Sequence, residues 1–419
     1  MAAYSGLVVG ATTCAHMLWL RLFLPFAGAY FLSYHYRTAN AVVGPVLSAE
    51  LSLGAADLGL LTSAYFLGFG LAQLPLGMFL DRFGARRVEA SLLLIAALGA
   101  AVFASSPDIA TLTLGRGLIG LGVSACLMAS LKTFSLWFPP ERQASLVGWI
   151  MTAGTLGALA AATPLDLALR VATWREIFYV LAAVTLGMAA WLWFGVPEKP
   201  GQPKPPPFSE QWAGVRAVLA SPHFWRFAPL GFAQIGGFMA VQSLWSSAWL
   251  MQVNGYSRSL AADHLTAMSV AMIVAYSLIG LLATRLARRG VGASALLGGG
   301  MTLALVTLLL IIGEAVDQHY LLWIAYGSFS SFGTLAYTAM SAGFPVALSG
   351  RANSTLNLMV FAGAFSLQWG LGILIDLMLG AGRSAVEAHR YAFVALFVLQ
   401  LGAFLWMLVG ARKTPSEVA

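Results

Sequence analysis

Long apolar stretches alternate with short polar connections along most of the chain. A window of about 20 residues, the length that crosses ~30 Å of hydrocarbon as a helix, finds twelve such stretches. The predicted membrane-spanning helices cover residues 22–47, 58–79, 87–105, 109–137, 143–169, 174–195, 227–252, 260–284, 292–314, 319–347, 353–379 and 387–410. The pattern therefore predicts an all-α membrane protein with twelve transmembrane helices that use most of the chain.

Composition agrees with a membrane protein. Charged residues make up 9% of the 419 residues, against ~25% in soluble domains, so the surplus apolar surface must face lipid. The net charge of +7 does not indicate a nucleic-acid partner, because the basic residues form short clusters between apolar stretches. Cys14 and Cys126 lie far apart in apolar surroundings and indicate neither a disulfide framework nor a metal site.

The basic residues also predict an orientation. With the N-terminus inside, fifteen Lys and Arg residues fall in cytoplasmic segments and five in outer ones, so the positive-inside rule places both termini in the cytoplasm. We expect a cell inner membrane. Residues 1–21 lack a basic n-region and a small-residue cleavage site and are not predicted to be a cleaved signal peptide; Met17 is an alternative start.

One long polar segment divides the chain into two halves. Residues 197–226 begin with the Pro-rich run PEKPGQPKPPP, a stiff linker, and continue into a predicted surface helix. This cytoplasmic segment separates a six-helix bundle at 22–196 from a second at 227–411, which a tail at 412–419 follows.

The two halves repeat each other in sequence. Gly77-x3-Asp81-Arg82 is matched by Gly280-x3-Thr284-Arg285, and a basic pair follows each. A second set of matches pairs Phe138-Pro139, Arg142, Gly148 and Gly154 with Phe344-Pro345, Arg351, Asn357 and Gly363. Duplicated six-helix halves related by pseudo-two-fold symmetry are typical of secondary transporters.

Two motifs carry a resemblance to a known family. The run from Gly77 to Arg87, GMFLDRFGARR, resembles the loop 2–3 signature of the major facilitator superfamily, and Arg116-Gly117-x2-Gly120-x-Gly122 is similar to its second signature. The resemblance implies two six-helix bundles and transport by alternating access, with spans one, four, seven and ten around a central cavity. The stretches 61–66 (LTSAYF) and 73–77 (QLPLG) also resemble members that handle organic anions and sugar phosphates.

The chain departs from two branches of that family. Drug/proton antiporters carry a Gly-Pro pair in span five, where this chain reads Gly154-x2-Gly157 and then Thr163-Pro164. Nitrate carriers resemble one another in arginines within spans two and eight, and these spans contain none here. An efflux pump for amphipathic or cationic compounds remains the alternative, although it needs acidic residues in the cavity and the sequence offers few.

Two arginines within spans are candidate ligands for an anion. Arg37 and Arg116 lie at membrane depth, where insertion of an arginine costs ~2.5–3.5 kcal/mol. We therefore expect each to have an ion-pair partner or a function. Tyr30 and Tyr34 share the helix face of Arg37, and Asn40 lies near it. Together these groups suit a carboxylate or phosphate. In the alternative, each arginine only ties helices together, and the resemblance also gives Arg116 a structural or proton-coupling role.

Two further stripes are candidate cavity linings. Span seven carries Gln234, Gln242 and Trp245 on one face, and span ten carries Tyr326 and Tyr337. We expect them to bind substrate, although such stripes are also typical of helix packing.

Other charged residues are candidates for coupling and for conformational latching. Asp166 and Asp376, near equivalent ends of spans five and eleven, are candidate proton-coupling groups or, alternatively, hydrated helix ends. The resemblance implies a latch that breaks when the halves rock, in which Asp81 pairs with Arg142; its residues are Asp81, Arg82, Arg86, Arg87 and Arg142. Alternatively, these charges only set the topology.

The remaining classes fit less well. The six histidines have no catalytic or metal-site spacing, so an enzyme is not expected, and packing explains His264, Met268 and Met272 better than a soft-metal ladder does. A non-transporting sensor of the same fold is a third class. We expect a monomeric symporter of a small anionic molecule, with protons as coupling ion and with no cofactor or metal.

Overall fold

The computed structural model describes residues 2–138, 140–197, 208–287, 289–314 and 317–411. All of its regular elements in these ranges are helices. Nine helical stretches in the described chain are long and apolar enough to span a membrane: 55–73, 85–105, 109–137, 145–168, 174–195, 258–279, 293–312, 348–380 and 385–410. They match predicted spans two to six, eight, nine, eleven and twelve.

The N-terminal bundle contains nine helical segments. They are α1 (Ala2–Thr38), α2 (Asn40–Leu51), α3 (Ala55–Phe83), α4 (Ala85–Ser105), α5 (Ile109–Gly122), α6 (Cys126–Trp137), α7 (Pro140–Ala160), α8 (Thr163–Ala168) and α9 (Trp174–Gly195).

The second half begins with the linker helix α10 (Phe208–Ala220). The C-terminal bundle then contains α11 (Pro222–Leu230), η1 (Gly231–Gly236), α12 (Gly237–Ala240), η2 (Val241–Trp245), α13 (Ser246–Gln252), α14 (Arg258–Ala287), α15 (Ala293–Ile312), α16 (His319–Ser330), η3 (Ser331–Thr334), α17 (Leu335–Ser341), α18 (Val346–Gly380) and α19 (Ala385–Ala411).

Helix irregularities concentrate in four of the predicted spans. Span one is interrupted at Ala39, span four between α5 and α6, and span ten by the 3-10 turn η3. Span seven contains the two π-helical turns η1 and η2. Spans one, seven and ten are absent from the nine long stretches, whereas the interrupted span four is among them. A fifth interruption separates α7 from α8. Irregular turns of this kind are often found at functional sites.

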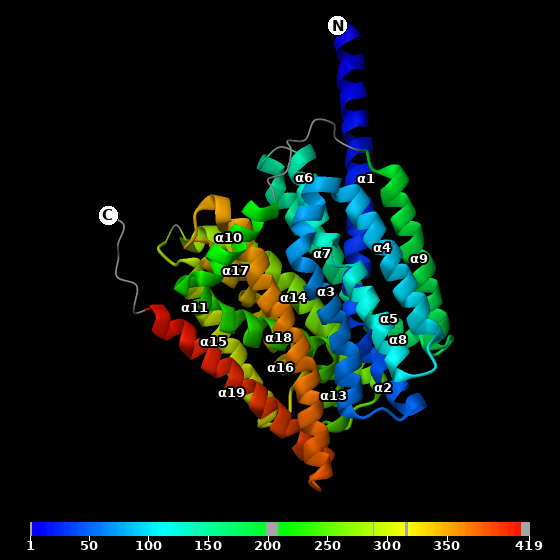
Figure 1. The fold of residues 1–419 in the computed structure, drawn as a ribbon, viewed down its shortest axis with the longest axis vertical. Coiled ribbons are helices and arrows are strands. Elements are labelled where there is room, and N and C mark those ends of the chain that lie inside the picture. Colours follow the sequence, from blue (N-terminus) through cyan, green and yellow to red (C-terminus); the bar gives the residue numbers. More distant parts are fainter. Residues whose placement is uncertain (1, 139, 198–207, 288, 315–316, 412–419) are drawn as a thin grey trace.

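The helices run up and down between two ends of the bundle. We call the end at which α1 begins the proximal end and the opposite one the distal end (Figure 1). Glu50 of α2 accepts a 2.7 Å hydrogen bond from Trp174 Nε1 of α9 at the distal end. Asn254 and Glu314 meet there at 3.4 Å. The up-and-down order therefore agrees with the predicted topology.

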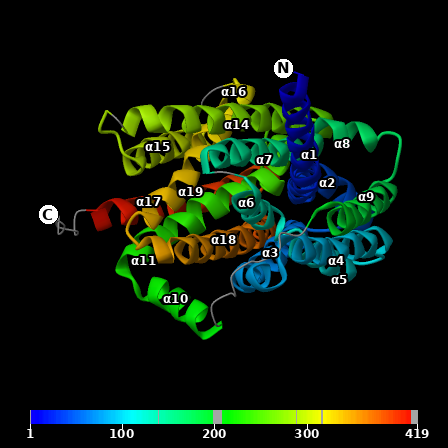
Figure 2. The ribbon, with the colours of Figure 1, turned by 90° about the horizontal axis from the view of Figure 1, so that it is seen from above.

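The two bundles lie side by side. Viewed from the proximal end, α4, α5 and α9 lie on one flank and α10, α11 and α15 on the other (Figure 2). The bundles meet where α3 packs on α18 and where α7 packs on α14. The interface therefore joins spans two and five of one half to spans eleven and eight of the other, as a pseudo-two-fold axis requires.

In each bundle a close glycine contact joins two corresponding helices. A Cβ atom on Gly157 would lie 2.0 Å from the carbonyl oxygen of Phe31, and one on Gly363 would lie 2.0 Å from that of Phe232. Span five thus packs on span one, and span eleven on span seven, at a distance that only glycine allows. The contact supports the internal repeat seen in the sequence.

Candidate functional site

Arg37 lies between the two bundles, in the last turn of α1. Its side chain is buried, and its guanidinium carbon lies 4.3 Å from the ring centre of Tyr34. It also lies 5.6 Å from the ring of Phe69 and 5.9 Å from that of Phe361, which belongs to the C-terminal bundle. The arginine therefore contacts both halves of the molecule.

Phenol side chains from both bundles surround this guanidinium group. Tyr30, Tyr34 and Tyr65 of the N-terminal bundle interact with it electrostatically, and so do Tyr276 and Tyr337 of the C-terminal bundle. The rings of Tyr30 and Tyr34 meet edge to face at 5.0 Å. We call Arg37 and these five tyrosines the arginine–phenol cluster.

The cluster has the chemistry of an anion site. Arginine donates in a planar fork that suits carboxylates and phosphates, and phenol hydroxyls add neutral donors. Within the described ranges no acidic side chain forms an ion pair with Arg37, and its Nε has no hydrogen-bond partner. A buried cation of this kind is stabilised by an anion that enters from outside.

A chain of hydrogen bonds crosses between the halves beside the cluster. Tyr337 donates to Asn357 Oδ1 at 2.7 Å, and Asn357 Nδ2 donates to Gln73 Oε1 at 2.9 Å. Phe69 and Phe361 stack across the same interface with ring centres 4.2 Å apart. The cluster is thus built at the place where the halves touch.

Sequence reasoning did not select six of these residues: Tyr65, Phe69, Gln73, Tyr276, Asn357 and Phe361. A signal for Tyr65 and Gln73 was present, since both fall in the two stretches that resemble organic-anion carriers. Asn357 replaces the repeat-related Gly148, so it is a polar residue where the repeat has none. Nothing in the local pattern of span eight distinguishes Tyr276.

Arg116 has a different position. Its Nη1 donates to the carbonyl oxygen of Tyr36 at 2.9 Å, and its guanidinium carbon lies 5.4 Å from the ring of Tyr65 and 5.9 Å from that of Phe103. The last turn of a helix leaves carbonyls without an intrahelical partner, and Tyr36 lies in that turn of α1. In this structure Arg116 therefore hydrogen-bonds a free carbonyl at the end of α1, where span one is interrupted.

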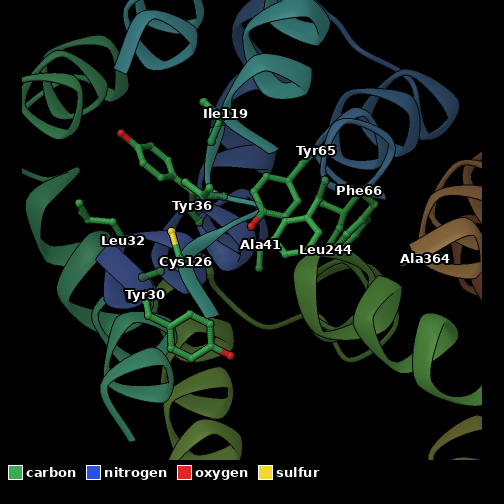
Figure 3. Close-up of a cluster of buried hydrophobic side chains, with 14 of the residues drawn as sticks. Tyr30, Leu32, Tyr36, Ala41, Tyr65, Phe66, Ile119, Cys126, Leu244 and Ala364 are labelled. Atoms are coloured by element: carbon green, nitrogen blue, oxygen red, sulfur yellow. The ribbon is translucent and has the colours of Figure 1, made fainter. Parts of the chain in front are cut away.

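Tyr36 itself shows that α1 presents two different faces. Its hydroxyl pairs with Thr185 Oγ1 of α9 at 2.9 Å, inside the N-terminal bundle. Figure 3 shows Tyr30 and Tyr36 pointing to different sides of α1, with Cys126 between them. Tyr30 belongs to the face of Arg37, and Tyr36 to the face that meets Arg116.

Gln242 lies close to the arginine–phenol cluster. It lines a small cavity of about 10 Å³ together with Thr38 and Ala41, the next residues of span one on the distal side. Such a volume holds about one water molecule. Its Nε2 also approaches Met272 Sδ at 3.3 Å.

The other predicted ligands lie away from the cluster. Asn40 donates to Thr62 Oγ1 at 3.0 Å inside the N-terminal bundle. Trp245 donates to the carbonyl of Gln368 at 3.0 Å. Gln234 is buried in η1, and Tyr326 packs on Phe238 with ring centres 5.5 Å apart, inside the C-terminal bundle.

Asp166 joins the halves at the distal end. Its Oδ1 accepts from Arg258 Nε at 2.6 Å, and its Oδ2 accepts from Arg170 Nη2 at 3.2 Å. The Asp166 side chain is 2% exposed. Arg258 opens span eight, so this ion pair ties the N-terminal bundle to the C-terminal one.

Asp376 makes the counterpart contact. Its two oxygens accept from the backbone N–H groups of Ala55 and Ala56, at 3.0 and 2.8 Å. These groups open span two, where a helix N-terminus favours a negative charge. Each half thus sends a carboxylate from its fifth span to the start of the second span of the other half. We call the two contacts the distal locks.

The loop-signature residues make contacts within the N-terminal bundle. In this structure Asp81 accepts from Lys132 Nζ of α6 at 2.6 Å, and Arg142 is exposed. The latch between Asp81 and Arg142 stays a prediction. Arg86 Nη1 donates to the carbonyl of Val196 at 3.0 Å. Arg82 lies over Phe83 at 5.6 Å.

Comparison with known proteins identifies the family. The family model of the Major Facilitator Superfamily matches residues 26–367. The chain therefore belongs to the Major Facilitator Superfamily, and its fold is that of a multi-pass membrane transporter and not of an enzyme.

Similar curated proteins include three transporters. A putative uncharacterized transporter, YgaY of Escherichia coli, is 33% identical over 36% of this chain and 38% of its own length. The hexuronate transporter of Bacillus subtilis is 27% identical over 43% and 42%, and the probable sulfoacetate transporter SauU of Cupriavidus necator is 27% identical over 38% and 37%. The matches thus span about two-fifths of these relatives.

Similar solved structures cover nearly the whole chain. A D-xylose-proton symporter superimposes with a TM-score of 0.75 at 16% identity, over 95% of this chain and 98% of its own. An inward-facing bacterial homolog of the human lysosomal transporter Spinster gives 0.72 at 19% identity, over 93% and 96%. These likenesses show the fold.

Proposed function

We propose that this protein is a secondary active transporter that moves a small organic anion, a carboxylate or a phosphate ester, by alternating access. Proton coupling, symport, a monomeric state and an inner-membrane location with cytoplasmic termini are parts of the proposal. The arginine–phenol cluster carries it, because it places a buried cation without an acidic partner, among the described residues, at the contact between the halves.

The relatives support an anionic substrate. Their names specify hexuronate, galacturonate and sulfoacetate, each of which carries a carboxylate or sulfonate. The residues that would meet such a group here are Arg37 and its phenols, and the carbon skeleton would pack on Phe69 and Phe361. Two guanidinium-facing aromatic rings suit a compact, partly apolar skeleton.

Alternating access is supported by where the contacts between the halves lie. The distal locks are polar and few, so a modest change in free energy breaks them, whereas packing within each bundle depends on close helix contacts. The halves can then move as rigid bodies about the cluster. A substrate that binds both halves would favour the occluded state, which lies between the inward-open and outward-open states.

Efflux of cations fits the described site less well. A cation site needs carboxylates on the central path. Three carboxylates at the interface are already bonded: Asp166 and Asp376 in the distal locks, and Asp263, which accepts from Thr163 Oγ1 at 2.7 Å.

The test is transport by the purified protein in liposomes. Preloaded galacturonate should drive uptake of labelled galacturonate, and a screen should include sulfoacetate, a sugar phosphate, neutral galactose and a lipophilic cation. We expect exchange and thermal stabilisation with at least one of the anions and none with galactose. Stabilisation by the lipophilic cation alone would reject the anion proposal and favour efflux.

A further inference from the structure

Glu89 is a fully buried acidic residue that the sites above do not use. It lies in α4, four residues after the helix begins at Ala85, so it is about 6 Å from the proximal end at 1.5 Å per residue. Its exposed fraction is 0%, and neither carboxyl oxygen has a hydrogen-bond partner in the described structure. Reasoning from the sequence overlooked it because it follows Arg86 and Arg87 at a span boundary.

In the part of the chain that the structure describes, none of the ion pairs includes Glu89. The Cys126 thiol of α6 lies beside it. On its own helix, Arg86 donates to a backbone carbonyl, and on α5 Arg116 does the same. The Asp81–Lys132 pair closes the end of α3 against α6, and on α9 the facing polar group, Thr185, is bonded to Tyr36.

An ionised carboxylate in such a place is expensive. Transfer of an unpaired charge into a low-dielectric interior costs far more than transfer of the neutral acid, so a buried carboxyl without a partner takes up a proton. The position inside a predicted span strengthens the argument, because acidic groups inside spans mark proton pathways. In this conformation the geometry therefore requires a neutral Glu89.

Cys126 links this carboxyl to the anion site. The thiol lies beside Glu89 on one side and within electrostatic range of Arg37 on the other. Figure 3 places Cys126 of α6 in the buried cluster between Tyr30 and Tyr36 of α1. Arg37 follows Tyr36 on α1.

We propose that Glu89 is the proton-carrying residue of this transporter. While it is buried beside Cys126 its carboxyl holds the proton; when the halves move and water reaches the proximal end of α4, the O–H bond breaks, the proton passes to water and a carboxylate remains. The reverse step reloads it. Because the buried site disfavours the charged form, the proton leaves only in a conformation that admits water, and this ties proton release to the movement of the halves. The inference rests on the proposed function and names its coupling group.

The experiment has two readouts on the same protein in liposomes. Infrared spectra of the wild type and of Glu89→Gln report the C=O stretch of a neutral carboxyl group, with no substrate needed. A pH dye inside the liposomes reports proton movement when galacturonate is added outside, and galacturonate counterflow reports exchange without net proton movement. Glu89→Asp keeps the carboxyl, and Glu387→Gln changes an exposed acid at the distal end.

The expected result separates coupling from transport. Glu89→Gln should lose the neutral-carboxyl band and the galacturonate-linked proton movement while it keeps counterflow, and Glu89→Asp and Glu387→Gln should keep all three. The proposal is overturned if the band survives in Glu89→Gln, if its proton movement is unchanged, or if counterflow disappears together with proton movement in a variant that still melts like the wild type.

Failure of the proposed function looks different. Wild-type protein that exchanges galacturonate without moving protons would overturn the role of Glu89 and leave anion transport standing. Wild-type protein that exchanges none of the anions would reject the proposed function, and the coupling role would fall with it.

Discussion

Neutralising Asp166 should open the distal end more often. In Asp166→Asn the amide keeps the shape but turns two bonds to arginines, at 2.6 and 3.2 Å, into weaker ones. A hydrogen bond to a charged group contributes ~1.5–3 kcal/mol and a neutral one ~0.5–1.5. Arg258 is 31% exposed and Arg170 54% exposed, so solvent screens the second bond more strongly.

The net loss is about 1–2 kcal/mol, which corresponds to about a 5- to 30-fold change in the ratio of open to closed distal ends. Ala41→Cys reports that ratio, since Ala41 is 1% exposed and lines the small distal cavity. The background carries Cys14→Ser and Cys126→Ala. A membrane-impermeant maleimide added on the distal side should label the reporter about 5- to 30-fold faster in Asp166→Asn.

A matched control lies at the same end. Glu387 pairs with Arg383 at 3.9 Å within a single bundle, so Glu387→Gln should leave the labelling rate unchanged. An unchanged rate in Asp166→Asn, or an equal acceleration in Glu387→Gln, would refute the reasoning that the Asp166 contact holds the halves together.

Three further predictions concern binding and acid stability. Arg37→Gln should raise the Kd for galacturonate, measured by calorimetry, by about 30-fold or more, because removal of a buried charge partner costs ~2–5 kcal/mol. Arg37→Lys should weaken binding less. An unchanged Kd in Arg37→Gln would exclude the site. Gly154→Ala places a Cβ 2.6 Å from the ring of Tyr30 and 3.0 Å from that of Tyr34, so it should weaken anion binding several-fold without lowering the melting temperature, because alanine favours the helix by ~1 kcal/mol; equal Kd values would contradict this. Hydrogen bonds from Trp174 and then from Arg175 lower the pKa of Glu50, so its contribution to stability is present above its unfolded pKa of ~4.3 and lost as pH falls below that value. The melting temperature of the wild type should therefore drop more steeply in this acid range than that of Glu50→Gln. Parallel curves of melting temperature against pH would disprove the contribution.

The fold was predictable from the sequence because lipid imposes a simple rule. Apolar stretches of about 20 residues must be helices, and the internal repeat then pairs the halves. Boundaries in spans one, seven and ten were harder, since the 3-10 and π-helical turns and the break at Ala39 have no distinct residue pattern. Helix continuity there depends on tertiary contacts such as that of Arg116 with Tyr36.

The site was predictable only in part. Arg37, Tyr30 and Tyr34 share a helix face, so local periodicity was enough to group them. The positions of the other predicted ligands depend on how each helix is rotated about its axis. This rotation points the side chain of Arg116 into the N-terminal bundle and that of Tyr326 into the C-terminal bundle. The arrival of Tyr276 from the other bundle could not be read from one span.

The two distal locks differ in how sensitive they are to mutation of their donor residues. The donors to Asp376 are main-chain N–H groups at positions 55 and 56, which every amino acid except proline supplies, so that half of the contact is nearly indifferent to mutation. The contact of Asp166 depends on the side chain of Arg258, which a single codon change can remove. One distal lock therefore tolerates nearly any residue at its donor positions, and the other depends on a single side chain.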